Sequence, residues 1–327
     1  MTLHENKELF QDAVTATSQQ KGIPEIYVEK DYWVTLALHA IFNNEIGKET
    51  IFKGGTALSK CNKLIERFSE DIDLVVLRKK DETNNQLKTK IKKISKCVTN
   101  VIPEIEVDGI THKMGMIRKT AHRYEKSFDG NFGQVRDNII VESTWLGNFE
   151  PYTTGEVSSY IYEMMLQNNQ SNVINEYDMN PFEVLILSTK RTLCEKIMSL
   201  VRFSQTKDPI TDLSNKIRHI YDIHMMLKDN DLNLFFNSTK FYSMLLKVAN
   251  DDILSFKNNN KWLSNHPRTT ILFSDTENVW NQIKNTYETS FKELVFGEFP
   301  EAKEILNTLI SLSNRLNEIE WNIKPEK

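Results

Sequence analysis

The chain has 327 residues, enough for two ordinary domains or for one domain with a large extension. Hydrophobic residues make up 39% of it, including 17 Phe, 10 Tyr and 5 Trp, which supports packed cores and excludes bulk disorder. The net charge of −4 excludes the overall basic character common among nucleic-acid-binding proteins, so any RNA contact has to be local.

Cysteine spacing and hydropathy indicate the cellular compartment of the protein. Cys61, Cys97 and Cys194 are widely separated and lack metal-binding spacing, so neither a zinc site nor a disulfide framework is predicted. No window reaches the roughly 18 apolar residues of a membrane span, and the N-terminal residues lack the apolar segment of a signal peptide. We therefore expect a cytoplasmic protein with no membrane partner.

Residues 5–19 and 24–42 have the apolar spacing of two helices, separated near Gly22 and Pro24. In the second helix, Glu29, Lys30 and Asp31 interrupt a run of apolar residues. We interpret these charges as ordinary surface or structural pairs. The alternative is that Lys30 reaches a bound nucleotide.

The stretch 52–77 predicts a tight glycine turn, a short helix and a strand. Gly54 and Gly55 can adopt backbone angles closed to other residues, and a turn without side chains lets a phosphate approach main-chain N–H groups. Thr56 is expected to cap the helix, which we extend as far as Leu64.

Asp71 and Asp73 follow that helix, one residue apart at the start of the strand, so a period of two puts both on the same face. Two neighbouring carboxylates suit Mg²⁺ (or Mn²⁺), which shares them with phosphate oxygens of a substrate. A solvated strand edge is the alternative for an isolated pair of this kind, and the preceding glycine turn favours the metal site.

Residues 78–126 contain 13 Lys and Arg against 6 Asp and Glu, the strong basic excess of an otherwise acidic chain. The segment 87–102 predicts a Lys-rich helix, and the stretches 114–128 and 134–145 predict a hairpin with its turn at residues 129–131. Phosphate contacts supply most nucleic-acid affinity, so this region is a candidate for docking an RNA backbone. A solvated charged face is the alternative for any single lysine.

Four motifs carry a family resemblance. GGTALSK followed by RFSEDIDL, residues 54–60 and 67–74, resembles motif I of the nucleotidyltransferase superfamily and, more narrowly, the AbiEii/AbiGii toxins of bacterial abortive-infection (phage defence) and toxin–antitoxin systems. VEKDYWVT (28–35), TLCEKIMSL (192–200) and KIRHIYDIHMML (216–227) resemble further parts of that family. The chain departs from many nucleotidyltransferases in having Gly-Gly where they have Gly-Ser.

The resemblance implies an α+β fold, with a nucleotidyltransferase-like mixed sheet and flanking helices over residues 1–165. A mainly helical C-terminal lobe, residues 166–327, would contribute to the active site. It also implies a third carboxylate beside the aspartates, for which Glu142 is the match. Asp137 lies five residues earlier, on the opposite strand face, and is the weaker candidate.

The resemblance further implies roles for the site residues. Asp71, Asp73 and Glu142 would hold the metal, and Glu142 or Asp222 would accept or orient the proton of the acceptor hydroxyl. Phosphates of the NTP would be bound by Gly54, Gly55, Thr56, Ser59, Lys196 and Arg67. Lys196 and Asp222 should converge on the catalytic pocket from adjacent helices, although Arg218 and Asp222 could simply form an intrahelical pair.

The function implied is transfer of a nucleotide from an NTP to RNA, with the 3′ end of tRNA as the best acceptor and an antitoxin as a possible partner. A nucleotidyltransferase acting on a small molecule or a protein hydroxyl is the first alternative. It would be favoured if the basic surface of residues 78–126 lay far from the two aspartates. A nucleotide-binding regulatory module without turnover is the second alternative.

Overall fold

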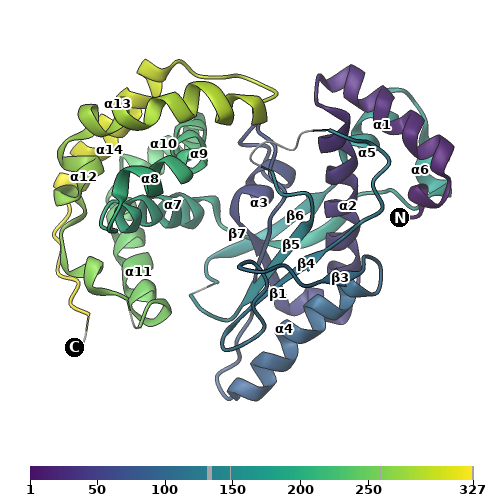
Figure 1. Cartoon of the computed structure of the whole chain (residues 1–327). Coiled ribbons are helices and arrows are strands. Elements are labelled where there is room, and N and C mark those ends of the chain that lie inside the picture. The colour runs from purple at the N-terminus through teal and green to yellow at the C-terminus, as the bar shows by residue number, and fades with distance from the viewer. Residues whose placement is uncertain (131–134, 148, 258, 326–327) are drawn as a thin grey trace. The chain divides into compact units, whose positions relative to one another are not determined.

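The computed structural model describes residues 1–130, 135–147, 149–257 and 259–325 (Figure 1). It forms two compact units, of which the first comprises Met1–Lys63 and Phe68–Leu187 and the second comprises Leu64–Arg67 and Ser188–Lys327. The boundary expected at residue 165 falls inside helix α5 (Tyr160–Gln167). The chain stays in the first unit up to Leu187, because strand β7 (Phe182–Leu187) pairs with β1 (Thr50–Lys53).

The first unit contains a mixed sheet of seven strands among its described residues, in the order β3-β4-β5-β2-β1-β7-β6 (Figure 1). The pairs β1–β7 and β2–β5 are parallel and the other neighbours are antiparallel. The expected α+β class is therefore confirmed. The remaining strands are β2 (Ile72–Val76), β3 (Glu104–Ile105), β4 (Ile117–His122), β5 (Ile139–Thr144) and β6 (Tyr152–Val157).

The predicted hairpin is also confirmed, since β4 and β5 pair in antiparallel register. Part of its expected turn, residue 131, lies outside the described residues. The predicted helices near the N-terminus are α1 (Lys7–Lys21) and α2 (Glu25–Phe42), and the Lys-rich helix is α4 (Asn84–Thr99). The first unit also has α3 (Gly54–Lys60) and α6 (Ser171–Glu176).

Helix α3 is shorter than the sequence predicts. It ends at Lys60, so Leu64 does not continue it, and residues 64–67 belong to the second unit. Thr56 is not the N-cap, because Lys53 takes that position and Thr56 is the third residue of the helix. The Thr56 hydroxyl instead donates to the main-chain oxygen of Asp71 at 2.6 Å, which ties α3 to the start of β2.

Helix α2 is buried on all sides from Ile26 to Leu38, which explains its nearly continuous apolar sequence. Glu29, Lys30 and Asp31 are buried with it, so of the two interpretations, surface or structural pairs, the surface one is wrong. Buried charges need partners. Glu29 accepts the main-chain N–H of Ser127 at 2.7 Å, and Asp31 accepts from the Lys60 ammonium at 2.6 Å.

The two faces of the sheet differ in the elements that pack against them. On one face, Arg118 of β4 donates to the Ser95 hydroxyl of α4 at 2.6 Å. Lys119 is the next residue of the same strand and therefore points to the other face. The register places Glu142 beside Lys119, so the face that carries these two side chains is opposite to α4.

The second unit is helical, and among its described residues the strand-like pairing is one isolated bridge between Arg67 and Val295. The long helices α7 and α9 carry the two motifs found downstream of residue 180. The α-helices are α7 (Thr189–Phe203), α8 (Pro209–Asn215), α9 (Ile217–Lys228), α10 (Asn230–Phe236), α11 (Thr239–Ser255), α12 (Ile271–Ser274), α13 (Thr276–Thr286) and α14 (Ala302–Asn317). No helix of the described residues has the length and apolar content required to cross a membrane.

Candidate active site

A row of four charged side chains crosses the sheet of the first unit. Asp73 of β2 stands beside Lys53 of β1 on one side and beside Glu142 of β5 on the other. Glu142 in turn stands beside Lys119 of β4. Directly opposed residues on neighbouring strands share a face, so all four side chains leave the sheet on the face opposite to α4. The sequence assignment of Glu142 as the carboxylate next to the aspartates agrees with this register.

The pKa of Asp73 shows how strongly these charges interact. Burial of its carboxyl group, reinforced by repulsion from Asp71 and Glu142, raises the pKa to about 7, while Lys53 and Lys119 act in the opposite direction. Burial is the largest cause, and the two lysines offset it only in part. A cation bound to this carboxylate would restore the ordinary ionised state.

The other two carboxylates are each paired with a basic side chain. The Arg136 guanidinium donates to both oxygens of Asp71, at 3.1 and 3.3 Å, and the Lys119 ammonium lies 3.2 Å from Glu142. These side chains are between 28% and 43% exposed, which makes the two pairs ordinary half-exposed ion pairs of small net stability. Such pairs can be exchanged at little cost when another ion enters.

Gly54 is fixed at the start of α3 by Asp73. Its φ is +82°, and a Cβ atom at this position would lie 2.4 Å from the Asp73 Oδ2 atom. A glycine is therefore required both for its backbone angle and for the close approach of the carboxylate. Gly55 follows it in the first turn of α3, while Thr56 and Ser59 are buried, and binding of phosphate by these residues stays a prediction.

The donor set next to Gly54 fits a hard cation such as Mg²⁺, which takes one or two carboxylates and completes its shell with water and phosphate oxygens. Asp71 and Asp73 supply two such carboxylates, and the raised pKa of Asp73 shows that they interact. No group of three or more His, Cys, Asp or Glu side chains among the described residues is arranged as a complete metal site. Glu142 stands beside Asp73 but is paired with Lys119, and its part in metal binding stays a prediction.

Lys30 lies near this site, which the sequence did not establish. Its ammonium donates to the main-chain oxygen of Arg136, so α2 supports the segment that carries the Asp71 partner. Burial lowers the pKa of Lys30 to about 8, against the opposing charges of Glu70, Asp71 and Asp137. Its presence within an apolar helix was the signal, but a charge in a sequence does not reveal whether it is buried.

The second unit contains a compact buried charge cluster. Asp222 of α9 accepts from the Arg67 guanidinium through both oxygens at 2.7 Å, and from the Lys196 ammonium of α7 at 2.7 Å. The side chains of Asp222, Arg67 and Lys196 are 0%, 3% and 7% exposed. These two cations hold the pKa of Asp222 well below its usual range, although burial alone would raise it. Lys196 and Asp222 thus do meet, and their convergence on the aspartates of the first unit stays a prediction.

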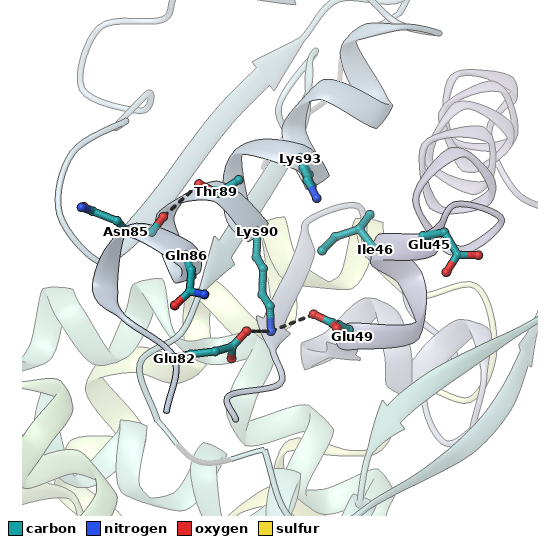
Figure 2. A pocket seen from close by; sticks show the side chains of 9 residues that line it. All are labelled: Glu45, Ile46, Glu49, Glu82, Asn85, Gln86, Thr89, Lys90 and Lys93. Atoms are coloured by element: carbon teal, nitrogen blue, oxygen red, sulfur yellow. Dashed lines mark hydrogen bonds and ion pairs between the residues drawn. The ribbon is translucent and has the colours of Figure 1, made fainter. Parts of the chain in front are cut away.

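A separate pocket of about 480 Å³ lies between the 3₁₀ segment Glu45–Glu49 and α4 (Figure 2). Lys90 spans it, with its ammonium 2.7 Å from Glu49 and 2.5 Å from Glu82, and it also donates to the main-chain oxygen of Leu77. None of the residues expected to bind metal or nucleotide lines this pocket. We interpret Lys90 as a residue that anchors α4.

The exposed lysines of α4 lie on the side of the sheet opposite to the charged row. Lys88, Lys92, Lys93 and Lys96 are exposed, and none of them has an ion-pair partner within the described residues. Because α4 covers the face opposite to Lys119 and Glu142, these lysines are remote from the charged row. The basic region of residues 78–126 is thus divided between two faces of the first unit.

Comparisons with known proteins found a matching family model and a similar solved structure. A family model described as nucleotidyl transferase AbiEii toxin, type IV TA system, matches residues 36–307, a range that includes every predicted site residue. No curated protein matches the chain in sequence. Among solved structures, the chain is similar to MenT4, a nucleotidyltransferase toxin from Mycobacterium tuberculosis H37Rv, with 14% identity over 91% of this chain and 98% of that one and a TM-score of 0.44. This likeness is too low to compare individual residues.

Replacing Gly54 by alanine should destabilise the protein by about 3 kcal/mol, because the added Cβ strains the backbone and collides with the Asp73 carboxylate. Gly109→Ala is a matched control, with φ of +72° and nothing within 4 Å of its Cβ. That control should lose only about 1 kcal/mol from backbone strain. Urea unfolding measures both, and equal losses would show that Asp73 does not fix this glycine.

The variant Asp222→Asn should lose about 3–5 kcal/mol at pH 7, since Arg67 and Lys196 would stay buried without their anion. The folded pKa of Asp222 is depressed, so its contribution is present above the unfolded pKa of about 3.9 and is lost as pH falls below it. The difference between parent and variant should therefore shrink between pH 5 and pH 3.

Urea unfolding at these pH values provides the measurement. Glu298→Gln is the control, because Glu298 pairs with Lys228 at the surface of the same unit and should contribute little. A difference for Asp222→Asn that stays constant down to pH 3 would contradict the assigned charge state.

Proposed function

We propose a nucleotide transfer reaction for this chain because it belongs to the AbiEii family of nucleotidyl transferase toxins of type IV toxin–antitoxin systems. In this proposal an NTP is the donor, RNA is the acceptor, and the 3′ end of tRNA is the preferred site of transfer. The observation that carries it is the close approach of Gly54 to Asp73, whose carboxyl group has a raised pKa beside Asp71 and Glu142. Active sites commonly concentrate charge in this way.

The carboxylates of the candidate site would have different roles in the reaction. Asp71 and Asp73 would hold Mg²⁺ or Mn²⁺, which when bound neutralises charge on the transferred phosphoryl group. Glu142 accepts the proton of the acceptor hydroxyl, a role that its partial exposure permits. Asp222 is the second candidate for this proton, and its pairing with Arg67 and Lys196 argues against it, because a carboxylate of low pKa is a weak base.

The biological setting follows from the family. Blocking tRNA by adding a nucleotide to its 3′ end would stop translation, in keeping with a toxin that acts in the cytoplasm. An antitoxin partner and a part in abortive infection by phage belong to the same proposal. The antitoxin partner is supported by the type IV toxin–antitoxin description of the family.

A protein or small-molecule hydroxyl is the second candidate acceptor, and one observation favours it. The exposed lysines of α4 lie on the face of the sheet opposite to the charged row, so an RNA backbone on them would have to reach around the first unit to the carboxylates. A compact acceptor needs no such surface.

The central experiment incubates the protein with each radiolabelled NTP, Mg²⁺ and total RNA. Label should enter a tRNA-sized band, and Asp73→Asn should lower the rate by about 100-fold or more, because several kcal/mol of charge stabilisation are lost. Asp137→Asn is the matched control, since Asp137 is an exposed carboxylate paired with Lys126 and should leave the rate unchanged. Absence of label from RNA with all four NTPs would refute the RNA acceptor, and label in protein would support the second candidate.

Replacing Lys88, Lys92, Lys93 and Lys96 together by glutamine tests RNA docking on α4. If RNA binds there, the KM for RNA should rise at least about tenfold, with kcat unchanged. The plot of the logarithm of the RNA association constant against the logarithm of salt concentration should become less steep by about 3. Exposed lysines of the second unit provide a control of equal charge change: Lys240, Lys247, Lys257 and Lys303. Identical RNA binding by the two variants would remove α4 from the docking surface.

A further inference from the structure

The face of the sheet opposite to α4 carries equal numbers of carboxylates and cations, and two of their ion pairs are partly exposed. Three carboxylates, Asp71, Asp73 and Glu142, face three cations, Lys53, Lys119 and Arg136. A divalent ion that joins the aspartates would add two positive charges to this balanced group. The cations already present would then be repelled from the carboxylates.

Arg136 is placed so that its side chain can change partner while its backbone stays fixed. The main-chain N–H of Arg136 donates to Glu70 at 3.4 Å, and its main-chain oxygen accepts from the buried ammonium of Lys30. The side chain of Arg136 is 43% exposed, and its guanidinium contacts the two oxygens of Asp71 that a metal ion would use. A metal ion and this guanidinium therefore compete for the same carboxylate.

Lys119 holds the corresponding position at Glu142. Its backbone is fixed by the β4–β5 register, and its side chain is 28% exposed. Once released from the carboxylates, both cations would stand at the edge of the site where a triphosphate adds several negative charges. Arg in particular binds phosphate oxygens through two parallel hydrogen bonds.

The cations that the sequence assigned to the phosphates are less available. Arg67 and Lys196 are buried against Asp222, and moving either one would leave that carboxylate short of a partner in a desolvated site. The first unit therefore needs a local source of positive charge for the nucleotide.

We propose that Arg136 and Lys119 are the phosphate-binding cations of the first unit, which hold Asp71 and Glu142 in the free protein and transfer to the triphosphate when Mg²⁺ and NTP bind. This inference rests on the proposed function. In it, the two ion pairs keep the carboxylates neutralised until substrate arrives. No covalent step is involved, and the exchange is one of hydrogen-bond and ion-pair partners.

The proposal predicts opposite effects on two binding constants. Arg136→Ala should tighten binding of Mn²⁺ alone by about 2–5-fold, because a competing cation is gone, and should weaken binding of a non-hydrolysable NTP with Mn²⁺ by about tenfold or more. Electron paramagnetic resonance of free Mn²⁺ measures the first constant, and isothermal titration calorimetry measures the second. A residue that only supports the fold would weaken both.

Two further variants complete the test. Arg136→Lys keeps the charge without the two-point contact and should recover part of the nucleotide affinity. Lys113→Ala is the matched control, since Lys113 lies beside the same sheet and pairs with Glu104 at 2.6 Å, away from the charged row, and both constants should stay at the parent values.

The outcomes separate this inference from the function on which it rests. If the parent protein binds Mn²⁺ and NTP but Arg136→Ala leaves both constants unchanged, or weakens both, the partner exchange is refuted and nucleotide transfer is not. If the folded parent binds no NTP in the presence of Mn²⁺, the inference and the proposed function both fail. Opposite shifts for Arg136→Ala, with Lys113→Ala unchanged, support the exchange.

Discussion

The sheet of the first unit is governed by one constraint, which is that three carboxylates gathered on one face must be neutralised. The register of β1, β2, β5 and β4 sets Lys53, Asp73, Glu142 and Lys119 side by side. Asp71, immediately before the start of β2, pairs with Arg136 from the segment before β5. Burial, reinforced by the neighbouring carboxylates, nevertheless raises the pKa of Asp73 to about 7. A cation bound on this face would favour the ionised form of these carboxylates.

The charges of the molecule fall into two classes according to their burial. Asp31 with Lys60, and Asp222 with Arg67 and Lys196, are almost fully buried and have short hydrogen bonds. Breaking such a pair leaves a charge in a desolvated site, so these groups hold helices in fixed positions. The Asp71–Arg136 and Glu142–Lys119 pairs are partly exposed and contribute little to stability. Chemistry that requires partners to change is therefore better served by the second class.

The placement of α4 matters for the acceptor. A lysine-rich helix suggests a nucleic-acid surface, yet its apolar side binds it to one face of the sheet while the carboxylates use the other. An acceptor RNA that used both surfaces would have to be large and folded, as tRNA is, whereas a compact acceptor would use the carboxylate face alone. The pocket beside α4 does not alter this, because Lys90 within it is already held by Glu49 and Glu82.

Local pattern in the sequence was enough to predict much of the first unit. The glycine turn, the pair Asp71 and Asp73 and the β4–β5 hairpin follow from residues near one another in the chain, where backbone angles and a period of two decide the outcome. Glu142 was identified through the family resemblance. Tertiary structure alone decided that Glu29, Lys30 and Asp31 are buried, that the first unit extends to Leu187, and that Lys119 and Arg136 face the carboxylates. These features depend on pairing and burial between segments far apart in sequence, and a charged residue carries the same letter whether it ends in solvent or in a core.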